Sequence, residues 1–128
     1  MKTEISTIFK KLQDQICLGL EKINTSSKFS EDLWERPGGG GGRSRTLSKG
    51  KIIQKGGVNF SEVSGPTPET ILKSLDLPLS DFYATGVSIV IHPVNPWVPI
   101  IHMNVRYFEI SDGTYWFGGG IDLTPHYV

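Results

Sequence analysis

The chain has 128 residues, and its thirteen basic and thirteen acidic side chains cancel to a formal net charge of +0. This length allows at most one domain with a modest core, and the charge balance offers no global field to nucleic acid or anionic lipid. A single cysteine, Cys17, excludes an internal disulfide framework and a cysteine-based zinc cluster. No apolar run approaches the roughly 20 residues of a membrane span, and neither a signal peptide nor a transit peptide is recognisable. We therefore expect a soluble, cytoplasmic protein.

The predicted elements begin with an amphipathic helix, because apolar residues recur at helical spacing from Ile5 to Ile23. Strand patterns dominate the rest of the chain, with short connections between them. In chain order we predict a strand at 29–36, a five-glycine loop at 38–42, a hairpin of 43–47 and 51–55, a strand at 58–63, a helix at 68–75, and strands at 85–92, 100–110 and 114–117. The pattern indicates an α+β fold with a mostly antiparallel sheet covered by helices.

The strand at 100–110 carries polar residues at intervals of two: His102, Asn104 and Arg106. Successive side chains of a strand alternate faces, so these three point the same way and the apolar residues between them point toward the core. Histidine exchanges a proton near neutral pH, asparagine both donates and accepts hydrogen bonds, and arginine pairs with carboxylates. We interpret the strand as one wall of a ligand site. The alternative is the solvated outer face of an edge strand. Aromatic neighbours favour a broad apolar cavity; they are Trp97, Tyr107, Phe108, Tyr115, Trp116 and Phe117.

The glycine run 38–42 is followed by Arg43 and Arg45. Glycines let backbone N–H groups turn toward an anion, and two arginines could clamp a carboxylate or phosphate. The run lacks the ending of a Walker P-loop and the strand–loop–helix context of a dinucleotide fingerprint. A flexible surface loop is the equally weighted alternative.

Two further candidates flank the polar strand. Ser88 and His92 share a face of the preceding strand about 13 Å apart, and His92 is either a ligand or a structural, exposed histidine at the strand end. Asp122 follows the glycine triplet 118–120, which allows close approach of a large ligand. Asp122 would bind ligand N–H groups or act as a base; alternatively it caps a following helix.

These residues resemble one family. The resemblance rests on WER at 34–36, GGGGGRSR at 38–45, GVN at 57–59, ATGVSIVIHPVNPWVPIIHMNVRYFE at 84–109 and WFGGGIDLTP at 116–125. Together, in this order, they are similar to the oxygen-dependent coproporphyrinogen III oxidases. The family's chains are far longer, so the resemblance implies that residues 1–128 are the N-terminal part of a single oxidase domain whose remainder is absent from this chain.

The resemblance implies a large, mostly antiparallel sheet flanked by helices, here incomplete, and a homodimer in the full-length protein. It implies oxidative decarboxylation of two propionates of coproporphyrinogen III to vinyls, giving protoporphyrinogen IX in haem biosynthesis. It also implies O2 as the oxidant and no organic cofactor, and it leaves open whether a divalent metal takes part. Nucleic acid and a membrane span are not expected.

The resemblance also implies roles for single residues. His102 matches the family's proton donor, and Asp122 matches an aspartate that engages the pyrrole N–H groups. His92 matches a metal-binding histidine whose partner ligands lie outside this chain. The substrate-binding positions are Ser88, Asn104, Val105 and Arg106. Two alternatives stay open: a catalytically inactive fragment of that enzyme, with exposed apolar surface, or a glycine-loop anion-binding module.

Overall fold

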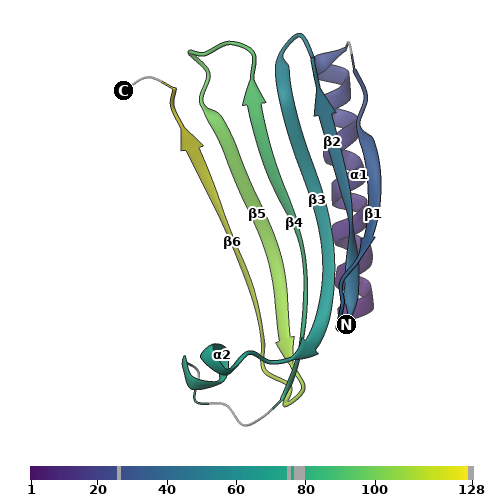
Figure 1. Cartoon of the computed structure of the whole chain (residues 1–128), viewed down its shortest axis with the longest axis vertical. Coiled ribbons are helices and arrows are strands. Elements are labelled where there is room, and N and C mark those ends of the chain that lie inside the picture. Colours follow the sequence, from purple (N-terminus) through teal and green to yellow (C-terminus); the bar gives the residue numbers. More distant parts are fainter. Residues whose placement is uncertain (26, 75, 77–79, 127–128) are drawn as a thin grey trace.

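The computed structural model describes residues 1–25, 27–74, 76 and 80–126. Its elements are α1 (Lys2–Asn24), β1 (Ser30–Glu35), β2 (Gly40–Ser48), β3 (Ile53–Pro66), α2 (Glu69–Ser74), β4 (Asp81–Pro93), β5 (Ile100–Ile110) and β6 (Tyr115–Thr124). The strands form one six-stranded sheet in the order β1-β2-β3-β4-β5-β6, and every neighbouring pair is antiparallel (Figure 1). The predicted α+β fold with an antiparallel sheet is confirmed.

Several strands are longer than predicted, because glycines that we expected to end them lie inside them. Gly40–Gly42 belong to β2: all three pair with β3, and Gly41 and Gly42 also pair with β1. The predicted five-glycine loop is therefore wrong over these residues. The separate strands expected at 51–55 and 58–63 are the single strand β3. The hairpin between β2 and β3 is confirmed. Of the helix predicted at 68–75, residues 69–74 are helical and position 75 lies outside the described residues.

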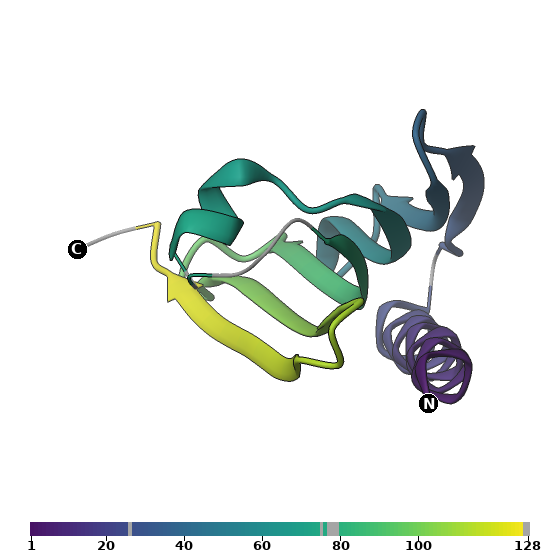
Figure 2. The same ribbon diagram turned by 90° about the horizontal axis from the view of Figure 1, so that it is seen from below.

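Helix α1 covers one face of the sheet. It lies behind β1, β2 and β3 in Figure 1 and to one side of the sheet in Figure 2. The core that it forms with the strands consists of Ile5, Phe9, Cys17, Val58, Phe60, Val87, Ile89 and Tyr107. The apolar positions of β5 between the polar ones therefore do point toward the core, as predicted. No helix in the described part of the chain is long and apolar enough to cross a membrane.

A polar side chain ties α1 to the sheet. The Gln13 side chain is fully buried, and its Nε2 donates to the carbonyl oxygens of Arg43 at 2.6 Å and Val58 at 2.8 Å. Its Oε1 accepts a hydrogen bond from Arg43 Nε at 2.7 Å. Burying an amide is costly unless its hydrogen bonds are made, so this arrangement fixes the position of α1 along the strands.

The opposite edge of the sheet is not covered in this way. Strand β6 pairs only with β5, and the apolar side chains of Phe117, Ile121 and Leu123 are 60%, 71% and 57% exposed. These three residues lie on the same face as α1, which does not reach so far. The exposed apolar surface that we expected of this chain is present at this edge.

Candidate functional site

The strand register brings the predicted polar residues of three strands onto one face. Asn104 pairs with Ser88 on β4 and with Gly120 on β6, while His102 pairs with Asp122. Directly paired residues of antiparallel strands project to the same side of the sheet. Since Met103 and Tyr107 contact the α1 core, these polar residues lie on the side away from α1. We call this side the polar face; its members are Ser88, His92, His102, Asn104, Arg106 and Asp122.

The side chain of Val105 does not share this face. It packs against the core cluster under α1, between two residues of the polar face. Only the main chain of Val105 can therefore meet a ligand on the polar face.

A hollow of about 310 Å³ lies at the centre of the polar face. It is lined by Ser61, Gly86, Val87, Ser88, Asn104, Val105 and Arg106. Arg106 is exposed and has no ion-pair partner among the described residues. Asn104 Oδ1 is buried, and it too has no hydrogen-bond partner among the atoms described. An unsatisfied buried acceptor costs about 1–3 kcal/mol, so a ligand N–H at this point would be favourable.

Ser61 is a member of the hollow that the sequence did not reveal. It lies on β3, where it pairs with Gly86, which in turn pairs with Arg106. Nothing in the local sequence distinguishes Ser61 from other strand serines. Only the register of β3 against β4 and β5 places it beside the predicted residues.

Two histidines gather at one end of the polar face. His102 lies directly across from Asp122, and His92 lies on β4, two positions beyond Val90, the partner of His102. Partial burial, together with the positive charges of Lys55, His102 and His126, lowers the pKa of His92. The lowered pKa favours the neutral imidazole, which suits a proton acceptor or a metal ligand.

The residues at this end do not by themselves fit a metal ion. Within the described ranges there is no group of three or more histidine, cysteine or carboxylate side chains arranged to hold a metal. Structural and catalytic zinc sites use at least three protein ligands.

The glycine triplet lies inside β6, and its last residue, Gly120, leaves open space on the polar face. A Cβ on Gly119 would lie 2.6 Å from the Asn104 carbonyl oxygen, but a Cβ on Gly120 would meet nothing within 4 Å. Gly120 faces the polar side opposite Asn104. Asp122 continues the same strand and begins no helix in the described residues, so its alternative role as a helix cap is wrong.

A family model described as "Coproporphyrinogen III oxidase" matches residues 4–128. The chain belongs to the coproporphyrinogen III oxidase family. It is 54% identical over 118 residues to a protein of Prochlorococcus marinus (strain NATL1A) named oxygen-dependent coproporphyrinogen-III oxidase, covering 91% of this chain and 34% of that protein. A protein of Coxiella burnetii (strain Dugway 5J108-111) with the same name is 47% identical over 131 residues, covering 98% of this chain and 42% of that protein. The chain thus spans about a third to two fifths of the length of these relatives.

The aromatic residues expected around the polar strand are divided between the two faces. Tyr107 contacts both Tyr115 and Phe117 on the α1 side, and Trp97 is 81% exposed in the connection between β4 and β5. Among the six aromatic residues predicted to line one cavity, only Phe108 and Trp116 lie on the polar face. The prediction of a single aromatic cavity is therefore wrong in part. Another aromatic residue reaches this face from β1: the Trp34 indole lies across Gly42 and donates to Ser44 Oγ at 3.2 Å.

The anion-binding interpretation of the glycine run does not hold in this member of the family. Arg43 and Arg45 project to the α1 side and form ion pairs with Asp14 at 3.0 and 2.8 Å. Arg45 also pairs with Glu31 at 2.9 Å. Both guanidinium groups are thus engaged by carboxylates of the chain itself. They stabilise the docking of α1 and β1, and the predicted clamp is wrong.

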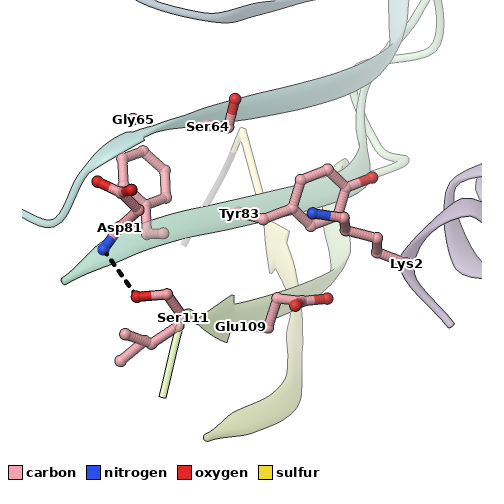
Figure 3. A pocket seen from close by; sticks show the side chains of 9 residues that line it. Lys2, Ser64, Gly65, Asp81, Tyr83, Glu109 and Ser111 are labelled. Carbon is pink, nitrogen blue, oxygen red and sulfur yellow. Dashed lines mark hydrogen bonds between the residues drawn. The ribbon is translucent and has the colours of Figure 1, made fainter. Parts of the chain in front are cut away.

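A second hollow, of about 330 Å³, lies beside the N-terminus of α1 (Figure 3). The Lys2 ammonium lies 5.1 Å from the centre of the Tyr83 ring, and Glu109 and Asp81 also line the hollow. The Tyr83 hydroxyl donates a hydrogen bond to Glu62. None of the predicted site residues lines this hollow, so it is separate from the predicted site.

Proposed function

We propose that the polar face binds coproporphyrinogen III and contributes to the oxidative decarboxylation of two of its propionates to vinyl groups. The product is protoporphyrinogen IX, an intermediate of haem biosynthesis, and the oxidant is O2. One observation carries the proposal. In a chain of this family, Arg106 and the buried Asn104 Oδ1, neither with a partner among the described residues, line one hollow on the side of the sheet away from α1.

The chemical groups of the hollow complement those of the substrate. Coproporphyrinogen III carries four propionate carboxylates around four pyrrole N–H groups. Arg106 would pair with a carboxylate, for which a guanidinium has the matching planar geometry. The unsatisfied oxygen of Asn104 would accept a pyrrole N–H, and Ser88, across the strand pair, would donate to a second carboxylate oxygen. Val105 would contribute its main chain.

Each decarboxylation is a two-electron oxidation. A propionate arm, one O2 and one proton give a vinyl group, CO2 and H2O2. Asp122 would accept the pyrrole N–H proton, which makes the ring electron-rich enough to react with O2. The resulting peroxide would remove a hydrogen from the propionate arm, and cleavage of the bond to the carboxylate would release CO2 and form the vinyl. His102, paired across the strands with Asp122, would donate the proton that the departing peroxide requires. Asp122 would return its proton to the pyrrole nitrogen as CO2 leaves, so the net reaction consumes only the proton from His102.

Three further features belong to the same proposal. His92 is a candidate metal ligand in a full-length protein, where other segments would have to supply its partners. The reaction uses no organic cofactor. We also propose a homodimer in the cytoplasm for the full-length enzyme.

Turnover of coproporphyrinogen III, followed by porphyrin fluorescence after oxidation of the product, tests the proposal. The assay compares this 128-residue chain with a full-length relative. In each of the two proteins, the variants Asp122→Ala and Arg106→Ala, or the substitutions at the matching positions of the relative, are measured as well. We expect both substitutions to abolish turnover by the relative. Full activity of the Asp122→Ala protein refutes the role given to Asp122, and turnover by neither parent protein refutes the enzyme assignment.

One rival function is favoured by a specific observation. The chain spans about a third of the length of its relatives, and apolar side chains of β6 stay exposed in the described residues. A catalytically inactive fragment that still binds the tetrapyrrole would show binding by calorimetry but no fluorescent product, whereas its full-length relative would show both.

A further inference from the structure

Three aromatic rings form a stacked column on the polar face: Phe82, Phe108 and Trp116. The Phe82 and Phe108 rings are 5.7 Å apart with an interplanar angle of 6°. The Phe108 and Trp116 rings are 4.5 Å apart with an angle of 27°. Stacking stabilises each pair of rings beyond the burial of area, so the rings support one another. We call this arrangement the aromatic column.

The aromatic column adjoins Arg106. Phe108 follows Arg106 by two residues on β5, so the two side chains share a face about 7 Å apart. Trp116 lies two residues before Gly118, which pairs directly with Arg106. The column thus continues the polar face immediately beyond the Arg106 guanidinium.

Space for a ligand remains between the column and Arg106. Among the described atoms, only Arg106 Cγ lies within 4 Å of a Cβ built on Gly118, at 3.9 Å. The glycine therefore leaves open space between the Trp116 indole and the Arg106 guanidinium. The Trp116 residue is 36% exposed although its ring stacks on Phe108. Part of the column is therefore accessible from the polar face.

We propose that the aromatic column and Arg106 together form a subsite for one carboxyethyl-substituted pyrrole ring. The ring face would lie on the column at Trp116, and its two-carbon arm would carry the carboxylate across to Arg106. Each pyrrole of the reduced tetrapyrrole is aromatic, so it offers a π-face to the indole, and an arginine beside aromatic faces adds cation–π attraction. This inference rests on the proposed function and extends it, because it states which part of the substrate lies at this end of the face.

The test is anaerobic calorimetry with coproporphyrinogen III, in which the absence of O2 prevents turnover. Trp116→Leu keeps apolar area but removes the π-face, and Trp116→Phe restores an aromatic ring. Trp97→Leu is the matched control, since Trp97 is a surface tryptophan outside the polar face. We expect Trp116→Leu to weaken binding about fivefold, and Trp116→Phe and Trp97→Leu to stay within twofold of the parent chain.

A double-mutant cycle tests whether ring and carboxylate belong to one subsite. If they do, the effect of Trp116→Leu shrinks in the Arg106→Gln background, because the arm no longer holds the ring on the column. Equal affinities of Trp116→Leu and Trp97→Leu, or full additivity with Arg106→Gln, overturn the inference and leave the proposed function standing. Absence of binding by the parent chain overturns the proposed function, and the inference with it. Circular dichroism of each variant checks that it is folded. If Trp116→Leu is unfolded, Trp116→Phe replaces it as the deciding variant. A Trp116→Phe affinity more than twofold below that of the parent chain then overturns the inference.

Discussion

Replacing Gln13 by leucine should destabilise the protein strongly. The substitution removes two hydrogen bonds to main-chain carbonyls and one from the Arg43 guanidinium, all on a fully buried side chain. Neutral hydrogen bonds contribute about 1 kcal/mol each and a charged one about 1.5–3 kcal/mol, and burial of leucine offsets part of the loss. We expect the free energy of unfolding to fall by about 3 kcal/mol. For a chain of this length the melting temperature then falls by about 10 °C.

The assay is thermal unfolding followed by circular dichroism, with urea unfolding for the free energy. Gln15→Leu is the matched control, because Gln15 lies on the exposed side of the same helix. Its melting temperature should stay within about 2 °C of the parent, as surface substitutions do. Equal melting temperatures for Gln13→Leu and Gln15→Leu would refute the reasoning that this buried network holds α1 on the sheet.

Two further predictions concern close packing and pH. A Cβ on Gly86 would lie 2.6 Å from the Val105 carbonyl oxygen, so Gly86→Ala should lower the free energy of unfolding by about 1–3 kcal/mol. Gly120→Ala places its methyl group in open space and should leave this free energy unchanged. Equal urea midpoints for the two variants would contradict the prediction. Burial and the hydrogen bond to Glu62 raise the pKa of the Tyr83 hydroxyl above its ordinary value of 10.0. The unfolded chain therefore loses this proton first, and stability should fall as pH rises above about 10. Tyr83→Phe should show a shallower decline in alkaline urea titrations, and an identical decline in both proteins would count against the contact.

The fold could be predicted where local pattern and tertiary context agree. The strand Ile100–Ile110 was predicted with the correct bounds, because its alternation matches a sheet covered on one face by α1. The glycine runs could not be assigned locally. A Cβ on Gly42 would lie 2.3 Å from the Trp34 ring, so this glycine serves close packing within a strand. The sequence shows glycine but not the ring that lies on it.

The candidate site could be predicted only in part for a related reason. Alternation along one strand places His102, Asn104 and Arg106 on a common face, and the structure confirms it. Which residues of other strands lie beside them depends on register, and register is not a local property. For this reason Ser61 was not predicted as part of the site. Arg43 was predicted to bind an anion, but its strand faces α1, where it pairs with Asp14.

The central claim is that the polar face binds the tetrapyrrole. The most direct test places a bulky side chain on the polar face without disturbing the fold. Gly120→Leu places a side chain opposite Asn104, where the structure leaves open space. Gly19→Leu makes the same change on the exposed side of α1, also in open space. In anaerobic calorimetry with coproporphyrinogen III, we expect Gly120→Leu to weaken binding at least tenfold at an unchanged melting temperature, while Gly19→Leu binds as the parent does. Equal affinity of the two variants would contradict the account.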